Sequence, residues 1–268
     1  MQDITVALVQ SDLVWENMDA NLERFGKLLD HVPTATDLVI LPEMFSTGFS
    51  IKSDVNAQNM EGQTLRWMKQ KASRLNMVVT GSILTKAGNE IFNRLFWVQP
   101  DGDVKKYDKR HLFRFAGEHK ILSGGTEKLI VRLKGWKIQP LICYDLRFPV
   151  WSKNRFQNGT YDFDLLLYVA NWPEARNYAW KNLLIARAIE NQAFCVGVNR
   201  VGTDEYGNLH SGDSMIIDPK GKILAKGEPF NQEIITTTLH YDYLLQSRKE
   251  FPVRSEEHTS ELQSRLHL

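Results

Sequence analysis

The most apolar run in the chain, residues 163–170 (FDLLLYVA), limits the folds that the sequence can adopt. It is far shorter than the roughly 20 apolar residues that a membrane-spanning helix requires. An apolar run of this length instead predicts a strand that is buried on both faces of a sheet. A second run of the same kind is residues 37–41 (DLVIL), bounded by Thr36 and Pro42. The sequence therefore predicts a sheet whose central strands are covered on both sides.

Amphipathic helices alternate with strands along the rest of the chain. Apolar residues recur at helical spacing in residues 17–31, 64–76 and 178–192. Two groups of turn residues, at 101–102 and 219–221, each separate two short strands and predict two hairpins. We therefore expect an α/β fold with a mixed sheet in one domain. The other predicted strands are 4–10, 77–84, 91–100, 104–109, 136–143, 194–199, 214–218, 223–226 and 234–239, and a short helix is predicted at 241–248.

The charge balance and the cysteine count exclude several classes of protein. Lys and Arg number 33 and Asp and Glu 32, so a net charge of +1 argues against a nucleic-acid-binding protein. The N-terminal sequence MQDITVALVQ shows no signal-peptide pattern, so we expect a cytoplasmic protein with no membrane partner. Cys143 and Cys195 are too few for a disulfide framework, and we expect both to be free thiols.

The last residues differ in character from the rest of the chain. Residues 254–268 (RSEEHTSELQSRLHL) are polar and lack a clear period. The first part, RSEEHTSELQS, looks like the translation of a common sequencing-library adapter. We therefore expect residues 1–253 to form the domain and residues 254–268 to be a non-native tail without a function.

Cys143 is the strongest single candidate for chemistry. It ends the predicted strand 136–143 and is followed at once by YDLRFP. Catalytic and ligand-binding groups of α/β proteins gather where central strands end. A lone cysteine is more often a small buried hydrophobic residue, which is the role that we expect for Cys195. A nucleophilic cysteine also needs a base and donors for the developing oxyanion.

Two charged residues could assist such a cysteine. Glu43 follows the buried run 37–41, and Lys109 lies in KKYDKRHLF after a predicted strand. Taken singly, each fits an ordinary exposed charge. A Cys–His pair through His111 or His119 is an alternative. No two histidines have the spacing of metal ligands, so we expect no metal.

Together, five ordered motifs resemble the nitrilase, or carbon-nitrogen hydrolase, superfamily: LPEMFSTGF, YDKRHLF, AGEHK, ICYDLRFP and ARAIENQAF. The resemblance covers residue 4 to about residue 253. It implies a Glu–Lys–Cys triad of Glu43, Lys109 and Cys143, a second glutamate at Glu118, and no cofactor. It also implies a four-layer α-β-β-α sandwich with mixed sheets, which usually assembles as a homodimer.

These residue types suit that assignment chemically. A thiol is a poor nucleophile until it loses its proton, which a buried Glu43 can accept and later give to the leaving ammonia. Lys109, between Glu43 and Glu118, would stay charged and stabilise the oxyanion with a backbone N–H near Tyr144. Water activated by Glu43 or Glu118 would then hydrolyse the acyl-thioester.

Within the superfamily, CYDLRFPVW, VANWPEAR and GVNRVGTD are similar to the omega-amidase branch. This resemblance implies the keto-amide substrates 2-oxoglutaramate and 2-oxosuccinamate, which glutamine transaminases release, including in methionine salvage. Arg147 and Arg176 are candidate partners for the substrate carboxylate, although each could form a structural ion pair instead. Trp172 and Phe115 are candidates for the pocket wall, although both could be core aromatic residues.

Three alternatives remain at this point. The first is another small-amide or N-carbamoyl hydrolase of the same superfamily, which substrate screening would separate. The second is a binding protein on the same fold that has lost catalysis. The presence of Glu43, Lys109, Glu118 and Cys143 argues against it, because such a protein would not need all four residues. The third is a redox-sensing thiol protein, which would pair Cys143 with Cys195.

Overall fold

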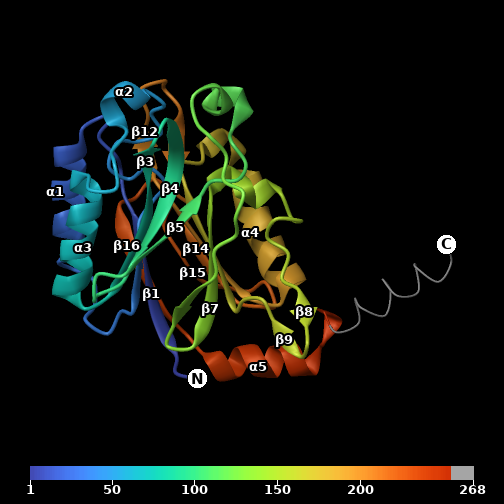
Figure 1. Ribbon diagram of the computed structural model, residues 1–268. Helices are drawn as coiled ribbons and strands as arrows, with labels where there is room; N and C mark the ends of the chain where they lie inside the picture. The colour runs from blue at the N-terminus through green and yellow to red at the C-terminus, as the bar shows by residue number, and fades with distance from the viewer. Residues whose placement is uncertain (255–268) are drawn as a thin grey trace, which may run out of the picture.

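The computed structural model describes residues 1–254, which form four layers in the order helix, sheet, sheet, helix (Figure 1). Helices α1 (Met18–Leu29) and α3 (Gln63–Leu75) cover the outer face of the first sheet, and α4 (Asn177–Asn191) covers the second. This architecture confirms the predicted α-β-β-α sandwich. The alternation of helices and strands alone predicted one mixed sheet, because it carries no information on how strands divide between two sheets.

The first sheet has six strands in the order β16-β1-β2-β3-β4-β5. β1, β2 and β3 run parallel to one another, and the outer strands pair antiparallel. The pairing of β1 with β16 places Leu239 opposite Ile4, so the two ends of the domain meet in one sheet. The strands are β1 (Ile4–Gln10), β2 (Leu38–Ile40), β3 (Val78–Ala87), β4 (Glu90–Val98), β5 (Val104–Asp108) and β16 (Glu233–Leu239).

The second sheet repeats this plan in the order β15-β14-β11-β10-β7-β6, with β7, β10 and β11 parallel. Pro140 lies within β7, a position that a central strand normally disfavours. The β6 ladder reaches only Ile138, so on that side Pro140 has no neighbouring strand that requires its missing N–H. The strands are β6 (Val131–Leu133), β7 (Trp136–Ile142), β10 (Leu165–Ala170), β11 (Phe194–Asn199), β14 (Met215–Ile217) and β15 (Ile223–Lys226).

Several short elements lack a sequence signal because each is only a few residues long. They are α2 (Ser53–Asn56), η1 (Arg114–Ala116), η2 (Glu118–Lys120), η3 (Cys143–Arg147), η4 (Glu174–Arg176), β8 (Phe156–Gln157), β9 (Thr160–Tyr161), β12 (Val201–Thr203) and β13 (Leu209–Ser211). The last helix, α5 (Tyr241–Glu250), confirms the short helix predicted there.

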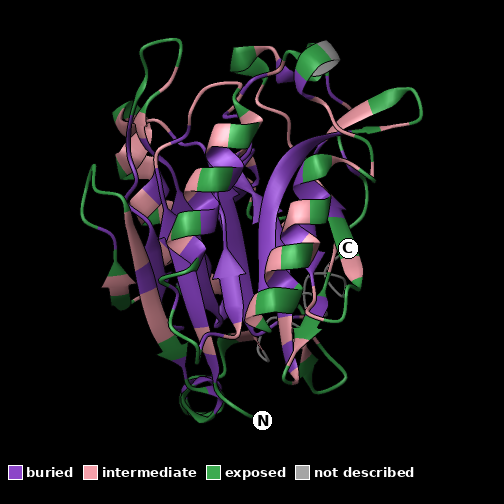
Figure 2. Cartoon of the chain, turned by 90° about the vertical axis from the view of Figure 1, so that its left-hand side faces the viewer, coloured by how far each residue is buried: buried purple, intermediate pink, exposed green. Residues whose placement is uncertain are grey.

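Buried apolar residues form two main clusters. One fills the space between the two sheets and below α4, and the other lies between the first sheet and the α1–α3 layer. Figure 2 looks onto this layer, with exposed residues on the outer sides of the helices and buried strands behind them. In residues 1–254 no helix has the length and apolar character to cross a membrane. Of the predicted tail, only Arg254 belongs to the described residues.

Candidate active site

The predicted site residues converge at one end of the sandwich, where strands of both sheets end. Glu43 follows β2 and Lys109 follows β5 of the first sheet, while Cys143 follows β7 of the second. β5 is two antiparallel steps from β3 and therefore runs in the same direction. Its end consequently reaches the same edge as the ends of the parallel strands.

A buried charge cluster lies at this edge. Lys109 Nζ is 2.9 Å from Glu43 Oε1 and 3.1 and 3.0 Å from the two carboxylate oxygens of Glu118. All three side chains are at most 1% exposed. Burial alone would lower the pKa of Lys109, but the negative charges of Glu118 and Glu43 raise this pKa above its usual range. Lys109 therefore stays positively charged.

Glu118 experiences two opposing influences. Burial raises the pKa of its carboxyl group, whereas the charge of Lys109 lowers it. The backbone N–H of Phe113 donates to Glu118 Oε2 at 2.5 Å. The second carboxylate is thus held in place by both a charge and a peptide group.

Cys143 begins η3 in an unusual backbone conformation. Its φ of 44° lies in the left-handed region, which is strained for a residue other than glycine. The sharp turn ends β7 and places the thiol against the backbone oxygen of Asn171, at a distance of 4.0 Å. Burial and the Glu43 carboxylate raise the pKa of Cys143 well above its usual value, which Lys109 only partly counteracts. The thiol therefore keeps its proton unless a base removes it.

Two asparagines that the sequence analysis did not single out contact Glu43. Asn171 follows β10, and its backbone N–H donates to Glu43 Oε2 at 2.8 Å. Its side-chain amide also donates to the backbone oxygen of Glu43. Asn93, in β4, donates to Glu43 Oε1 at 2.8 Å. Asn171 directly follows the predicted strand 163–170, so the tendency of functional groups to gather where central strands end could have identified it. Nothing in the strand sequence EIFNRLFWV distinguishes Asn93 as a site residue.

A third unforeseen residue, Asp145, connects the two sheets below the site. Its buried carboxylate accepts hydrogen bonds from Tyr107 Oη at 2.7 Å, from the backbone N–H of His111 at 2.9 Å and from that of Ile142 at 3.1 Å. These donors lie close to Lys109 and Cys143 in the chain. Asp145 thereby fixes the segments that carry both residues.

The histidine alternative has no geometric support. His111 Nδ1 lies 2.8 Å from Asp145 Oδ1, and the His111 ring stacks on Phe148 with a centroid separation of 3.8 Å. His119 is exposed. Neither histidine lines the pocket that contains Cys143.

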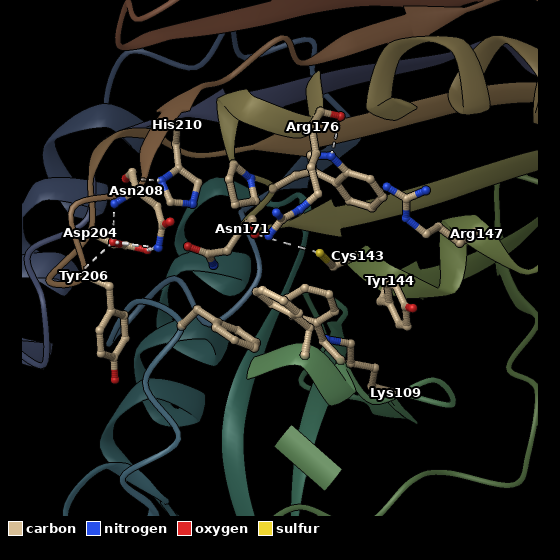
Figure 3. A pocket seen from close by; sticks show the side chains of 15 residues that line it. Lys109, Cys143, Tyr144, Arg147, Asn171, Arg176, Asp204, Tyr206, Asn208 and His210 are labelled. Atoms are coloured by element: carbon tan, nitrogen blue, oxygen red, sulfur yellow. Dashed lines mark hydrogen bonds between the residues drawn. The ribbon is translucent and has the colours of Figure 1, made fainter. Parts of the chain in front are cut away.

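A pocket with a volume of about 130 Å³ opens onto Cys143 and Lys109 (Figure 3). Its volume lies below the roughly 300–1,000 Å³ typical of drug-sized ligands, so it suits a small molecule. Figure 3 shows Cys143 and Lys109 on one side and the β12–β13 turn on the other. All predicted pocket residues line it: Tyr144, Arg147, Trp172, Arg176 and Phe115. The turn adds Asp204, Tyr206 and Asn208, and β13 adds His210, none of which the sequence analysis foresaw.

Both predicted arginines lie against aromatic rings. The guanidinium carbon of Arg147 is 5.0 Å from the Trp172 ring centre, and that of Arg176 is 5.6 Å from the Phe113 ring centre. Within residues 1–254 neither guanidinium forms an ion pair with a carboxylate. Phe115 is 86% exposed, so it lies at the pocket mouth, whereas Trp172 forms the buried wall.

Cys195 occupies a different environment. It lies in β11, fully buried in the core and outside the pocket lining, as predicted for a packed thiol. Burial raises the pKa of its thiol above the usual range. Among the described residues, no three His, Cys, Asp or Glu side chains are grouped so that they could hold a metal ion.

Similarity to known proteins places this geometry in a family. Residues 5–249 match the carbon-nitrogen hydrolase family. The chain is 43% identical to the omega-amidase YafV of Yersinia enterocolitica, over 94% of this chain and 96% of that protein. It is 33% identical to the 2-oxoglutaramate amidase of Bacillus subtilis, over 83% and 86% of the two chains.

A solved structure agrees with both matches. A CN-hydrolase superfamily protein of Xanthomonas campestris, with an arsenic adduct in its active site, is 45% identical and superposes with a TM-score of 0.93. The match covers 96% of this chain and 97% of the other. The chain therefore belongs to the carbon-nitrogen hydrolase family and is an enzyme that hydrolyses the carbon–nitrogen bonds of amides.

Proposed function

We propose that the enzyme releases ammonia from the omega-amide of 2-oxoglutaramate, and of 2-oxosuccinamate, to give the 2-oxo acid. One observation carries this choice of substrate: two arginines, Arg147 and Arg176, line the pocket of the thiol without a carboxylate partner in residues 1–254. Arginine binds carboxylates in a bidentate manner, and both substrates carry a carboxylate. The omega-amidase relatives support the same choice.

In the acylation step, Cys143 Sγ attacks the amide carbon while the Glu43 carboxylate takes the thiol proton. A base is required because the pKa of this buried thiol lies well above its usual value. The oxyanion of the tetrahedral intermediate is stabilised by the Lys109 ammonium and by the backbone N–H of Tyr144, the residue after Cys143 in η3.

The intermediate then breaks its carbon–nitrogen bond. The protonated Glu43 gives its proton to the leaving nitrogen, which departs as ammonia and leaves an acyl-thioester on Cys143. Water attacks the thioester carbon, and Glu43 or Glu118 takes a proton from that water. The carbon–sulfur bond breaks, the thiolate is protonated again, and the 2-oxo acid is released.

This function can be tested by measuring ammonia release from a panel of substrates: 2-oxoglutaramate, 2-oxosuccinamate, several N-carbamoyl amino acids and butyramide. We expect kcat/KM to be highest for the two keto-amides, with Cys143→Ala as the blank. Higher kcat/KM values for N-carbamoyl amino acids would assign the enzyme to that sibling activity. No ammonia from any amide would favour an idle binding protein.

We also propose that residues 1–253 act as one domain, because the cluster between the sheets draws on both of them. We propose a homodimer formed through the sandwich face. Tyr178 and Ile189 lie on one face of α4 and are 78% and 51% exposed, which supports this assembly. Light scattering with size-exclusion chromatography tests it. The free, unpaired thiols are consistent with a reducing cytoplasm as the working compartment.

A further inference from the structure

We propose that Asn93 is a positioning residue that makes Oε2 of Glu43, and not Oε1, the atom that takes the Cys143 proton. This inference deepens the proposed function and rests on the role of Glu43 as the base. It assigns a function to a residue of β4 that does not line the pocket.

Asn93 contacts three members of the charge cluster from one position. Its Nδ2 donates to Glu43 Oε1 at 2.8 Å and lies 3.4 Å from Glu118 Oε1. Its backbone oxygen accepts the backbone N–H of Lys109 at 3.0 Å. The Asn93 side chain is fully buried. One residue therefore links Lys109 to both glutamates.

The two oxygens of Glu43 have unequal numbers of donors. Oε1 accepts from Lys109 Nζ at 2.9 Å and from Asn93 Nδ2 at 2.8 Å, while Oε2 accepts from the Asn171 backbone N–H at 2.8 Å. A carboxylate oxygen offers about two lone-pair sites, so Oε1 is occupied and Oε2 keeps one site for a proton.

Oε2 and the thiol also share one neighbouring residue, Asn171. Oε2 is held by the backbone N–H of Asn171, and the backbone oxygen of the same residue lies 4.0 Å from Cys143 Sγ. A proton on Oε2 can therefore return directly to the leaving nitrogen at Cys143. A proton on Oε1 would instead have to displace one of the two donors already bound there, Lys109 Nζ or Asn93 Nδ2.

The orientation of the Asn93 amide supports this role independently. Its Oδ1 is buried and has no hydrogen-bond partner among the described residues, which is costly for a polar atom. Rotating the amide would bring Oδ1 against two carboxylates. The side chain thus directs its Nδ2 donor toward Glu43 and leaves its Oδ1 acceptor without a hydrogen bond.

The charged and titratable groups that face Glu43 are Lys109, Glu118 and Cys143. Removing the Asn93 amide leaves all three in place but removes one of the two donors to Oε1, so that Oε1 can compete with Oε2 for the proton. The resulting change should affect proton transfer and leave substrate binding intact.

The test uses Asn93→Ala and Asn93→Asp, with Asn154→Ala as the matched control. Asn154 is equally buried and donates to the backbone oxygens of Phe163 and Asn191, at the opposite end of the sandwich. The readouts are kcat and KM for 2-oxoglutaramate, and the rate at which iodoacetamide alkylates Cys143 as a function of pH, followed by mass spectrometry.

We expect Asn93→Ala to lower kcat by about 10²-fold, as for a misplaced catalytic group, and to leave KM within about threefold. Alkylation should slow across the pH range, because the base that takes the thiol proton is less well positioned. Asn93→Asp should have a larger effect because it adds a third carboxylate to the cluster. Asn154→Ala should keep kcat, KM and the alkylation profile of the wild type.

Wild-type kcat and an unchanged alkylation rate in Asn93→Ala would overturn the proposal, as would an effect equal to that of the control. If Asn93→Ala does not fold, Asn93→Ser replaces it, since serine is too short to reach Glu43, and the same outcomes apply. Alkylation does not depend on the choice of amide substrate. A wild type that ignores 2-oxoglutaramate but alkylates normally would therefore contradict the proposed substrate and still allow the Asn93 test.

Discussion

The two ends of β10 each carry a buried ion cluster, and the clusters differ in charge balance. Beyond its C-terminal end, one lysine faces two carboxylates, those of Glu43 and Glu118. Before its N-terminal end, Arg248 faces a single carboxylate, and Arg248 Nη1 lies 2.8 Å from Asp164 Oδ1. The other guanidinium nitrogens of Arg248 donate to the backbone oxygens of Gln192 and Phe163, both at 2.8 Å.

This difference separates a structural ion pair from a cluster suited to catalysis. At Asp164 each charge has one counter-charge, so proton uptake there would only break the pair. At Lys109 a negative charge is left over, and burial raises the pKa of the Glu118 carboxyl. A buried excess charge costs stability, and it is useful where a proton must be taken up and returned.

Substitution of the two cysteines should give the largest difference, because one change affects turnover and the other affects stability. Cys143→Ala should lower turnover by about six orders of magnitude, as for loss of a nucleophile, and leave the melting temperature unchanged because the β-carbon remains. Cys195→Ala, in the core, should keep the wild-type kcat and lose stability. Ammonia release by Cys143→Ala at a substantial fraction of the wild-type rate would refute the mechanism.

Changing the excess carboxylate should have the next largest effect. Glu118→Gln keeps the shape of the side chain but removes its charge, so kcat should fall by about two to four orders of magnitude with little change in stability. If hydrolysis of the thioester slows more than acylation, mass spectrometry should detect the acyl group on Cys143. A turnover number close to the wild type would show that Glu118 has only a structural role.

At the opposite end the expected effect is on stability alone. Arg248→Met leaves Asp164 buried without a counter-charge and should lower the free energy of unfolding by about 3–5 kcal/mol, measured with urea. Because this end is remote from the thiol, kcat and KM of the folded variant should match the wild type. Adding Asp164→Leu should recover part of the lost stability. A reduced kcat in Arg248→Met would mean that the two ends are coupled.

Substrate recognition should respond more weakly than the chemistry. Arg147→Ala and Arg176→Ala should each raise KM for 2-oxoglutaramate by about 10–100-fold, the value of a charged hydrogen bond. The KM for butyramide, which has no carboxylate, should change little. Equal changes for both amides would reject carboxylate binding by that arginine.

The smallest effect is expected from the tail. Arg254 contacts Gln192 near the structural ion pair, and residues 254–264 look like a translated adapter sequence. Deleting residues 255–268 should leave both kcat and the melting temperature unchanged. A marked loss of activity would show that these residues belong to the functional protein.

The sequence predicts the parts of this molecule that repeat a regular pattern. The buried runs became β2 and β10, and the family motifs located Glu43, Lys109, Glu118 and Cys143, which the structure brings together. Glu43 and Lys109 follow strands of the first sheet and Cys143 follows a strand of the second, and periodicity cannot assign strands to two sheets.

Other site residues depend on tertiary structure alone. Asn93 lies within a strand, and its function depends on which side chains the neighbouring strand ends deliver. Asp204, Tyr206 and Asn208 reach the pocket from the short β12–β13 turn and His210 from β13, and this hairpin has no apolar pattern. Such contacts become visible only when the folded chain is known.

The pairing of β1 with β16 has a consequence for synthesis of the chain. β1 is made before its antiparallel partner β16, which ends only at Leu239, so one edge of β1 stays open while the residues between the two strands are made. An open edge of an apolar strand invites pairing with other chains. The site also needs Glu43 and Asn171, which are 128 residues apart. A fragment that ends before Asn171 would therefore lack one of the groups that hold the Glu43 carboxylate beside the thiol.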